Sequence, residues 1–188
     1  MRRLISFIQV TLDGYYAGPG EDIRWAHKDP DDAEWNEFVA GNASGGGSLL
    51  FGRLTYELMT SYWPTEMAAQ QNPIVAKRMN ESEKFVCSRT LDKVSWQNTT
   101  LLKGELVEEV RVLKQSLGEG IAILGSGSVV SQLATHGLID EFQIVVSPLL
   151  LGDGKRLFDE VHEKLPLRLT RSRTFGNGSV LLCYEPQS

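Results

Sequence analysis

Residues 120–130, GIAILGSGSVV, join an apolar run to a glycine-rich turn. The run GIAILG has almost no polar face, which is typical of a parallel strand that is buried on both sides. The residues after it, GSGSVVSQLATHG, have the pattern of a tight turn that opens a helix. This stretch therefore predicts one strand, turn and helix unit of an α/β sheet.

The same alternation recurs toward the N-terminus. Residues 3–10 are rich in Ile, Phe and Val and end at the turn signal Asp13-Gly14, so they predict a first strand in the middle of the sheet. A loop over residues 15–30, with Trp25 as its large apolar anchor, precedes an amphipathic helix over residues 31–41. SLLFG at residues 48–52 predicts a short buried strand, and GRLTYELM continues directly into a helix.

The segments on either side of residues 120–130 complete the pattern. Residues 73–80 predict a further helical turn or two, KFVCSR a strand, and residues 99–102 a weak strand. The clearest helix is GELVEEVRVLKQSLGEG, whose apolar residues are spaced by four, three and four: Leu106, Val110, Leu113 and Leu117. DEFQIVVSPLL predicts another strand, and RLTRSRTF and SVLLCYE flank Asn177-Gly178, a strong hairpin signal.

This order predicts a three-layer α/β fold with a mostly parallel central sheet and an antiparallel C-terminal hairpin. The 188 residues, of which 41% are hydrophobic, suit a single domain over 1–188. The net charge of -5 argues against nucleic acid or an anionic membrane as a partner. The chain shows neither a signal peptide nor a membrane span, and Cys87 and Cys183 suit reduced thiols, so we expect a cytoplasmic protein. Three histidines lack metal-ligand spacing, so no metal site is expected: His27, His136 and His162.

Three predicted strands end in polar or glycine-rich residues. These exits are Gly52-Arg53-Leu54-Thr55, Ser88-Arg89-Thr90 and Gly125-Ser126-Gly127-Ser128. Ligands of open α/β sheets bind outside the carboxyl ends of strands, where helix N-termini offer free N–H groups to phosphates. An elongated cofactor that carries phosphates would suit three such exits on one edge. Taken singly, Arg53 can be a surface charge, and the glycine segment can be only a tight turn. A Rossmann fingerprint fits this segment poorly, because Val130 stands where the motif has its third glycine.

Together these segments resemble the dihydrofolate reductase superfamily, and more closely its branch related to the C-terminal reductase domain of the riboflavin biosynthesis enzyme. The resemblance covers nearly the whole chain. The matching segments are TLDGYYAG, FGRLTYE, VCSR, ILGSGSVV and VSPLLLGDGKRLF. The pair formed by GRLTYE and LGSGSVV at this separation is more specific than either segment alone.

The resemblance implies NADPH as the cofactor. Arg53 and Thr55 match positions that hold its phosphates, and Ser88 and Arg89 match those that flank the 2'-phosphate, which a guanidinium binds through forked hydrogen bonds. The expected cofactor-binding residues are Ala17, Gly52, Arg53, Leu54, Thr55, Ser88, Arg89, Gly125, Ser126, Gly127, Ser128 and Val129. Many relatives carry Gly-Gly with a cis peptide where this chain has Gly125-Ser126, and the sequence leaves that bond open.

The substrate side offers two candidate catalytic acids. Glu34 lies nearest the helix carboxylate of dihydrofolate reductases, and its alternative role is to cap and solvate the helix start. Asp13 ends the first strand beside the expected nicotinamide, and its alternative role is that of a turn residue. Three further residues are expected to bind substrate: Thr11, Trp35 and Phe38.

The resemblance implies a reductase that transfers hydride to a small heterocyclic or ribosyl substrate. The riboflavin-pathway activity, 5-amino-6-(5-phosphoribosylamino)uracil reductase, is the first candidate, and dihydrofolate reductase is the second. Leu124 stands where the riboflavin-pathway reductases commonly have a glutamate. A nucleotide-binding or pteridine-binding protein without turnover and a plain Rossmann dehydrogenase are the alternatives. Relatives often form homodimers, to which the apolar residues 144–151 would contribute.

Overall fold

The structure is a computed structural model that describes residues 1–43 and 45–187. Its strands are β1 (Leu4–Thr11), β2 (Tyr15–Ala17), β3 (Ser48–Gly52), β4 (Lys84–Cys87), β5 (Thr99–Leu102), β6 (Ile121–Leu124), β7 (Glu141–Ser147), β8 (Lys155–Arg156), β9 (Leu167–Thr174) and β10 (Val180–Pro186). Its helices are α1 (Ala33–Ala43), α2 (Arg53–Tyr62), α3 (Glu66–Gln71), α4 (Pro73–Glu81), α5 (Leu106–Gln115) and α6 (Gly127–Thr135), with two short 3-10 turns, η1 (Pro19–Glu21) and η2 (Arg24–Ala26).

Eight strands form one sheet in the order β5-β4-β3-β6-β1-β7-β10-β9, and β2 pairs with β8 in a small second sheet. The six strands from β5 to β7 run parallel to one another. β10 pairs with β7 and with β9 in antiparallel fashion, which confirms the expected hairpin around Asn177-Gly178. β1 lies between β6 and β7, so the expectation of a central first strand is also confirmed.

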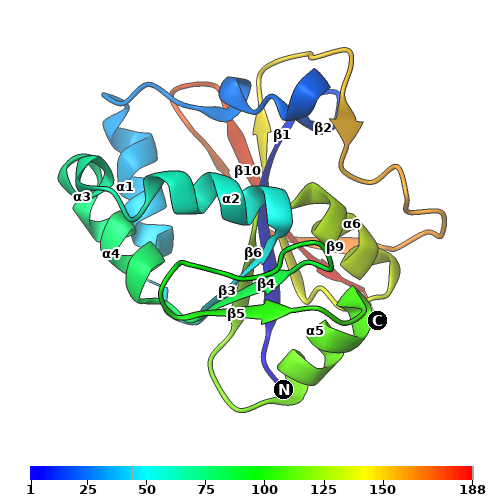
Figure 1. Ribbon diagram of the computed structural model, residues 1–188. Helices are drawn as coiled ribbons and strands as arrows, with labels where there is room; N and C mark the ends of the chain where they lie inside the picture. The colour runs from blue at the N-terminus through cyan, green and yellow to red at the C-terminus, as the bar shows by residue number, and fades with distance from the viewer. Residues whose placement is uncertain (44, 188) are drawn as a thin grey trace.

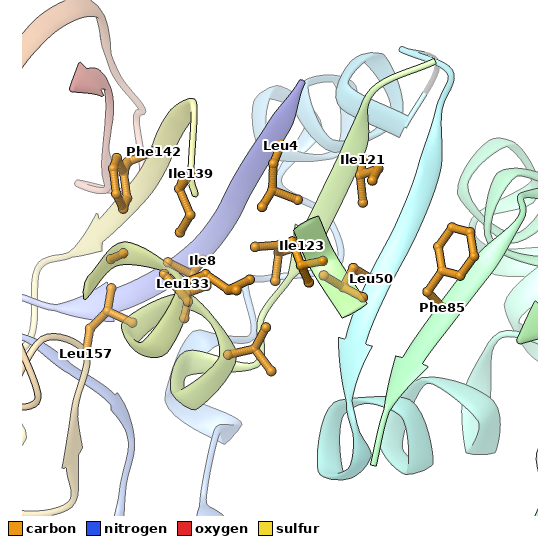
Figure 2. Close-up of a cluster of buried hydrophobic side chains, with 14 of the residues drawn as sticks. Leu4, Ile8, Leu50, Phe85, Ile121, Ile123, Leu133, Ile139, Phe142 and Leu157 are labelled. Carbon is orange, nitrogen blue, oxygen red and sulfur yellow. The ribbon is translucent and has the colours of Figure 1, made fainter. Parts of the chain in front are cut away.

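Helices cover both faces of the sheet, which gives the predicted three layers (Figure 1). One core cluster joins β1, β3, β6 and β7 to α5 and α6, and Figure 2 shows Leu133 of α6 beside Ile8 of β1. The opposite face packs against α2 and α4 through Phe51 and Tyr56, and against α1 through Trp35. Alternate residues of β1 therefore serve two different cores, as the two-residue period of a strand requires.

Two local expectations were wrong, and one helix was not predicted. Leu117 was expected on the buried face of the helix over 104–120, but it is 99% exposed, because α5 ends at Gln115 and Ser116 already has extended backbone angles. The loop over 15–30 contains the short strand β2 and two 3-10 turns. Residues 66–71 form α3, which the sequence pattern did not indicate; Thr65 caps it by accepting a hydrogen bond from the Ala68 N–H at 3.2 Å.

Within the described part of the chain, no helix is long and apolar enough to cross a membrane. The same residues contain no group of three or more His, Cys, Asp or Glu side chains that could hold a metal ion.

Candidate functional site

The three polar strand exits follow β4, β3 and β6, which are consecutive in the sheet. These strands are parallel, so their carboxyl ends lie at one edge. The expectation that the exits share an edge is therefore confirmed. What the exits bind remains a prediction from the sequence.

The N-termini of α2 and α6 lie side by side at this edge. The Gly52 N–H donates to Ser126 Oγ at 2.8 Å, and the Ser126 N–H donates to Thr55 Oγ1 at 3.1 Å. Neither helix has a side-chain cap among the described residues. The first N–H groups of a helix have no partner within it, so two uncapped N-termini together form a site that favours a diphosphate-sized anion.

The turn between β6 and α6 has a left-handed backbone at two successive residues. Gly125 has φ 56° and Ser126 has φ 53°, and no peptide bond among the described residues is cis. The bond between them, which the sequence left open, is therefore trans. A left-handed serine is uncommon, and the two hydrogen bonds of Ser126 to the α2 segment hold it in place.

Gly127, the first residue of α6, is buried against Tyr16 of β2. A Cβ atom added at Gly127 would lie 2.5 Å from three atoms of the Tyr16 ring. The next residue of β2, Ala17, is 2% exposed and pairs with Lys155 of β8. The small second sheet is thus packed directly onto the glycine turn.

The two arginines of the site are exposed, and each forms a salt bridge with a nearby glutamate. Arg53 pairs with Glu57 at 3.1 Å, one helical turn away, and Arg89 pairs with Glu105 at 2.8 Å. Side chains in such exposed pairs gain little from the pairing and can exchange partners at small cost. Ser88 Oγ instead accepts the N–H groups of Thr90 and Leu91, at 3.2 and 3.1 Å, and so shapes the turn that carries Arg89.

Asp13 has the turn role that the sequence left as its alternative. Its carboxylate accepts the Thr11 hydroxyl at 2.6 Å and the Gly152 N–H at 2.8 Å, and it also accepts the Leu151 N–H. These donors, the Thr11 hydroxyl first, lower the pKa of Asp13 to about 2. The group is ionised at neutral pH and anchors the loop after β7, so the geometry does not favour it as a proton donor.

Thr11 was expected to bind substrate, but its hydroxyl is already used. It is 1% exposed, donates to Asp13 and accepts the Tyr15 N–H at 3.0 Å. The Thr11 hydroxyl has one proton to donate, and that proton is engaged. Thr11 therefore closes the turn after β1, and its expected contact with a substrate stays a prediction.

The Asp13 contacts predict a pH dependence of folding. The pKa of Asp13 is about 2 in the folded chain and 3.8 in its ordinary state, so its contribution to stability is complete above 3.8 and is lost as the pH falls through this window. The difference in unfolding free energy between the wild type and Asp13→Asn should be constant from neutral pH to about pH 5 and shrink toward pH 2. Urea unfolding at a series of pH values measures it. A difference that does not change with pH would contradict the assignment.

The Glu34 carboxylate is likewise engaged by a distant part of the chain. Its carboxylate accepts the Gly176 N–H at 2.8 Å and pairs with Arg173 at 3.1 Å, both on the C-terminal hairpin. The Gly176 N–H, followed by Arg173, lowers the pKa of Glu34. Glu34 thus ties α1 to the turn between β9 and β10, and its expected catalytic role has no support in this geometry.

The aromatic residues of α1 join the same contact. Trp35 is 7% exposed, and its ring lies 5.2 Å from that of Phe175 in an edge-to-face arrangement. The ring centre of Phe38 lies 5.0 Å from that of Phe175 and 6.1 Å from that of Phe7 of β1. Both rings dock α1 on the sheet and the hairpin, and their expected contact with a substrate stays a prediction.

Three polar residues that the sequence analysis did not select gather on the α1 side of the carboxyl edge. Lys28 donates to Ser147 Oγ at 2.9 Å, and Gln9 Oε1 is buried without a hydrogen-bond partner among the described residues. Gln9 was a detectable signal, because it interrupts the apolar strand ISFIQVT. Lys28 gave none, because it lies among acidic residues in a loop.

Comparison with known proteins relates nearly the whole chain to one family. The family model of the RibD C-terminal domain matches residues 2–181. The uncharacterised protein YyaP of Bacillus subtilis strain 168 is 31% identical over 184 residues, which are 98% of this chain and 95% of YyaP.

Solved structures share the fold. A putative riboflavin biosynthesis protein from Shewanella sp. PV-4 superposes with a TM-score of 0.74 at 23% identity, covering 99% of each chain. The diaminohydroxyphosphoribosylaminopyrimidine deaminase/5-amino-6-(5-phosphoribosylamino)uracil reductase of Thermotoga maritima gives 0.65 at 14% identity, over 99% of this chain and 57% of that one.

Proposed function

The chain belongs to the RibD C-terminal domain family, and from this premise we propose that it is an NADPH-dependent reductase. It transfers hydride to a small heterocyclic or ribosyl substrate, and 5-amino-6-(5-phosphoribosylamino)uracil is the first candidate. The observation that carries the proposal is the pair of uncapped helix N-termini joined through Ser126. They lie beside two exposed arginines on the carboxyl edge of the sheet.

The residues present fit a nicotinamide dinucleotide. The first turns of α2 and α6 offer N–H groups to its pyrophosphate. Gly125 adopts the left-handed backbone of the turn, and Gly127 leaves room for the Tyr16 ring against the start of α6. Arg53 and Arg89 follow β3 and β4, where their guanidinium groups are available to further phosphates of the cofactor. When bound, the nicotinamide supplies the hydride.

The proton for the reduced bond is best supplied by water. Asp13 and Glu34 both have a lowered pKa and carboxylates engaged by N–H donors, so neither carries a proton at neutral pH. The same contacts speak against dihydrofolate as substrate, since its reduction in the superfamily uses a helix carboxylate, and Glu34 is bonded to the hairpin instead. The protein's own contribution is therefore to bind and orient the two reactants.

An NADPH oxidation assay with purified protein tests the proposal. We expect turnover with 5-amino-6-(5-phosphoribosylamino)uracil and none with dihydrofolate. Activity on dihydrofolate alone would assign the other branch of the superfamily. Tight NADPH binding without oxidation, tested over a panel of pyrimidine and pteridine acceptors, would instead identify a binding protein without turnover.

Arg89→Gln is expected to weaken NADPH binding by at least about tenfold while leaving NADH binding unchanged. Arg89 is the residue expected to form charge-assisted, forked hydrogen bonds with the 2'-phosphate, which NADH lacks. Its exposed pair with Glu105 contributes little to folding, so the variant should be as stable as the wild type. Quenching of tryptophan fluorescence by each cofactor measures both affinities.

Arg111→Gln is the matched control, because Arg111 is an exposed arginine paired with Glu108 on α5. It should leave the affinities for NADPH and NADH unchanged. Arg89 would not belong to the proposed 2'-phosphate site if Arg89→Gln lost affinity for NADPH and NADH equally. The same would follow if Arg89→Gln and Arg111→Gln lost equal affinity for NADPH.

We propose further that the protein works in the cytoplasm as a homodimer. Both of its thiols are free, and burial raises the pKa of Cys87 to about 12, which suits an inert reduced cysteine. Leu149 and Leu150, in the loop after β7, are exposed apolar residues available to a second copy. Light scattering at several protein concentrations tests the assembly.

A further inference from the structure

Lys28 places a cation above the carboxyl ends of β1 and β7. It belongs to the segment between β2 and α1, which passes over the end of the sheet on its way to α1 (Figure 1). Its Nζ donates to Ser147 Oγ at 2.9 Å and lies 5.5 Å from the centre of the Trp35 ring. Ser147 is the last residue of β7 and is 2% exposed, so the ammonium group is anchored on the sheet itself.

No carboxylate lies within 4.0 Å of this ammonium group in residues 1–43 and 45–187. Partial burial lowers the pKa of Lys28, and Asp32 opposes this shift only from a longer distance. An ammonium group has three N–H donors, and Ser147 accepts one of them. A partly desolvated cation of this kind has an unmet preference for an anion.

Gln9 adds an unused acceptor on the same face of the sheet. Gln9 and Thr11 point to one side of β1, and Thr11 is the strand partner of Ser147, so Gln9 and Ser147 share that side. The side-chain Oε1 of Gln9 is buried and has no partner in the described part of the chain. Buried polar atoms in native proteins are nearly always satisfied by protein or water, so this oxygen is an acceptor available to a further donor.

The position of Gln9 explains why a ligand would supply that donor. β1 pairs with β6 only as far as Phe7, opposite Leu124, while its pairing with β7 continues to Thr11. Beyond Phe7 the β6 side of β1 therefore has no strand partner, because the chain there turns away through Gly125 and Ser126. The carboxyl ends of strands are where α/β sheets bind their ligands.

We infer that Lys28 binds an oxyanion of the substrate, while Gln9 accepts a hydrogen bond from an N–H or O–H group of the same molecule. The substrate class is thus a small molecule that carries a phosphate or carboxylate together with a polar hydrogen. The inference rests on the proposed function for the role of this molecule as substrate. The binding of the anion itself is independent of turnover.

Lys28→Met tests the inference, because methionine keeps most of the side-chain volume and removes the charge. Two pairs of probes separate the chemistries: ribose 5-phosphate against ribose, and benzoate against benzamide. Binding is followed by the indole N–H resonance of Trp35, which lies beside Lys28 and is assigned from the spectrum of Trp35→Phe. We expect at least one charged probe to bind the wild type, and Lys28→Met to weaken it by at least about tenfold.

The matched control is Lys77→Met, which removes an exposed lysine of α4 and should bind the charged probes like the wild type. Lys28→Arg keeps the charge and should retain most of the affinity. Failure of both charged probes to shift the Trp35 resonance would overturn the inference. So would equal weakening of charged and neutral probes, or equal loss in the Lys77 variant.

NADPH affinity separates this inference from the proposed function. Lys28→Met should bind NADPH like the wild type, because Lys28 lies on the β7 side of β1 and the two helix N-termini follow β3 and β6. If the wild type binds the charged probes but not NADPH, the anion site stands and the reductase proposal fails. If it binds NADPH but neither charged probe, the anion site fails and the cofactor proposal stands.

Discussion

Replacing Gly127 with alanine is expected to weaken NADPH binding by at least about tenfold and to lower the unfolding free energy by about 1–3 kcal/mol. The new Cβ would lie 2.5 Å from three atoms of the Tyr16 ring, including the ring carbon attached to the Tyr16 Cβ. Rotation of the ring cannot clear such a contact, so either β2 or the start of α6 has to move. Both changes displace the N–H groups of α6 that we assign to the pyrophosphate. Urea unfolding and cofactor titration measure the two losses.

Gly41→Ala is the matched control for this steric argument. Gly41 lies in α1, and a Cβ there meets nothing within 4 Å, so alanine should stabilise the helix by up to about 1 kcal/mol. A second test is the double variant Gly127→Ala/Tyr16→Ala, in which the obstructing ring is gone. Adding Gly127→Ala to a Tyr16→Ala background should then cost much less than it costs in the wild type. A loss of the same size in both backgrounds would show that Tyr16 is not the cause.

The shared edge of the three strand exits could be predicted because its signals are local. GIAILGSGSVV and FGRLTYE each contain a strand, its exit and the start of the next helix within a few residues. Parallel strands place their carboxyl ends at one edge, so reading each exit separately was enough to gather them. The hydrogen bonds of Ser126 determine how the two segments contact each other. These contacts could not be predicted, because the sequence pattern of each segment carries no information about the other.

The roles of the two candidate acids could not be read from the sequence, because the partners of these side chains lie far away along the chain. Asp13 is held by the N–H groups of Leu151 and Gly152, about 138 residues later, and Glu34 is held by Arg173 and Gly176. A carboxylate near a strand end gives the same sequence signal whether it faces a ligand or a distant loop. Only the tertiary contact distinguishes the two roles. Here it engages both acids, while Lys28 has no carboxylate partner and Gln9 Oε1 no hydrogen-bond partner among the described residues.

Because Trp35 is held by tertiary packing, Trp35→Ala is expected to lower the unfolding free energy by about 3–5 kcal/mol, the range for a large buried aromatic side chain. Trp35 is 7% exposed, and its ring contacts those of Phe38 and Phe175 at 5.5 and 5.2 Å. Removing it opens the contact between α1 and the C-terminal hairpin. Urea unfolding followed by circular dichroism measures the loss without depending on tryptophan fluorescence.

A double-mutant cycle separates this packing role from substrate binding. Trp35→Ala and Phe175→Ala should be coupled by about 0.5–1.5 kcal/mol, because the two rings touch edge to face. Glu37→Ala, an exposed position on the same helix, should change stability by less than about 0.5 kcal/mol. If Trp35→Ala were as stable as the wild type and lost only substrate affinity, the ring would be a binding surface. If Trp35→Ala instead loses about 3–5 kcal/mol as expected, Trp35 has a packing role. Because Lys28 Nζ lies over the Trp35 ring, substrate affinity should then fall indirectly, through a displaced Lys28.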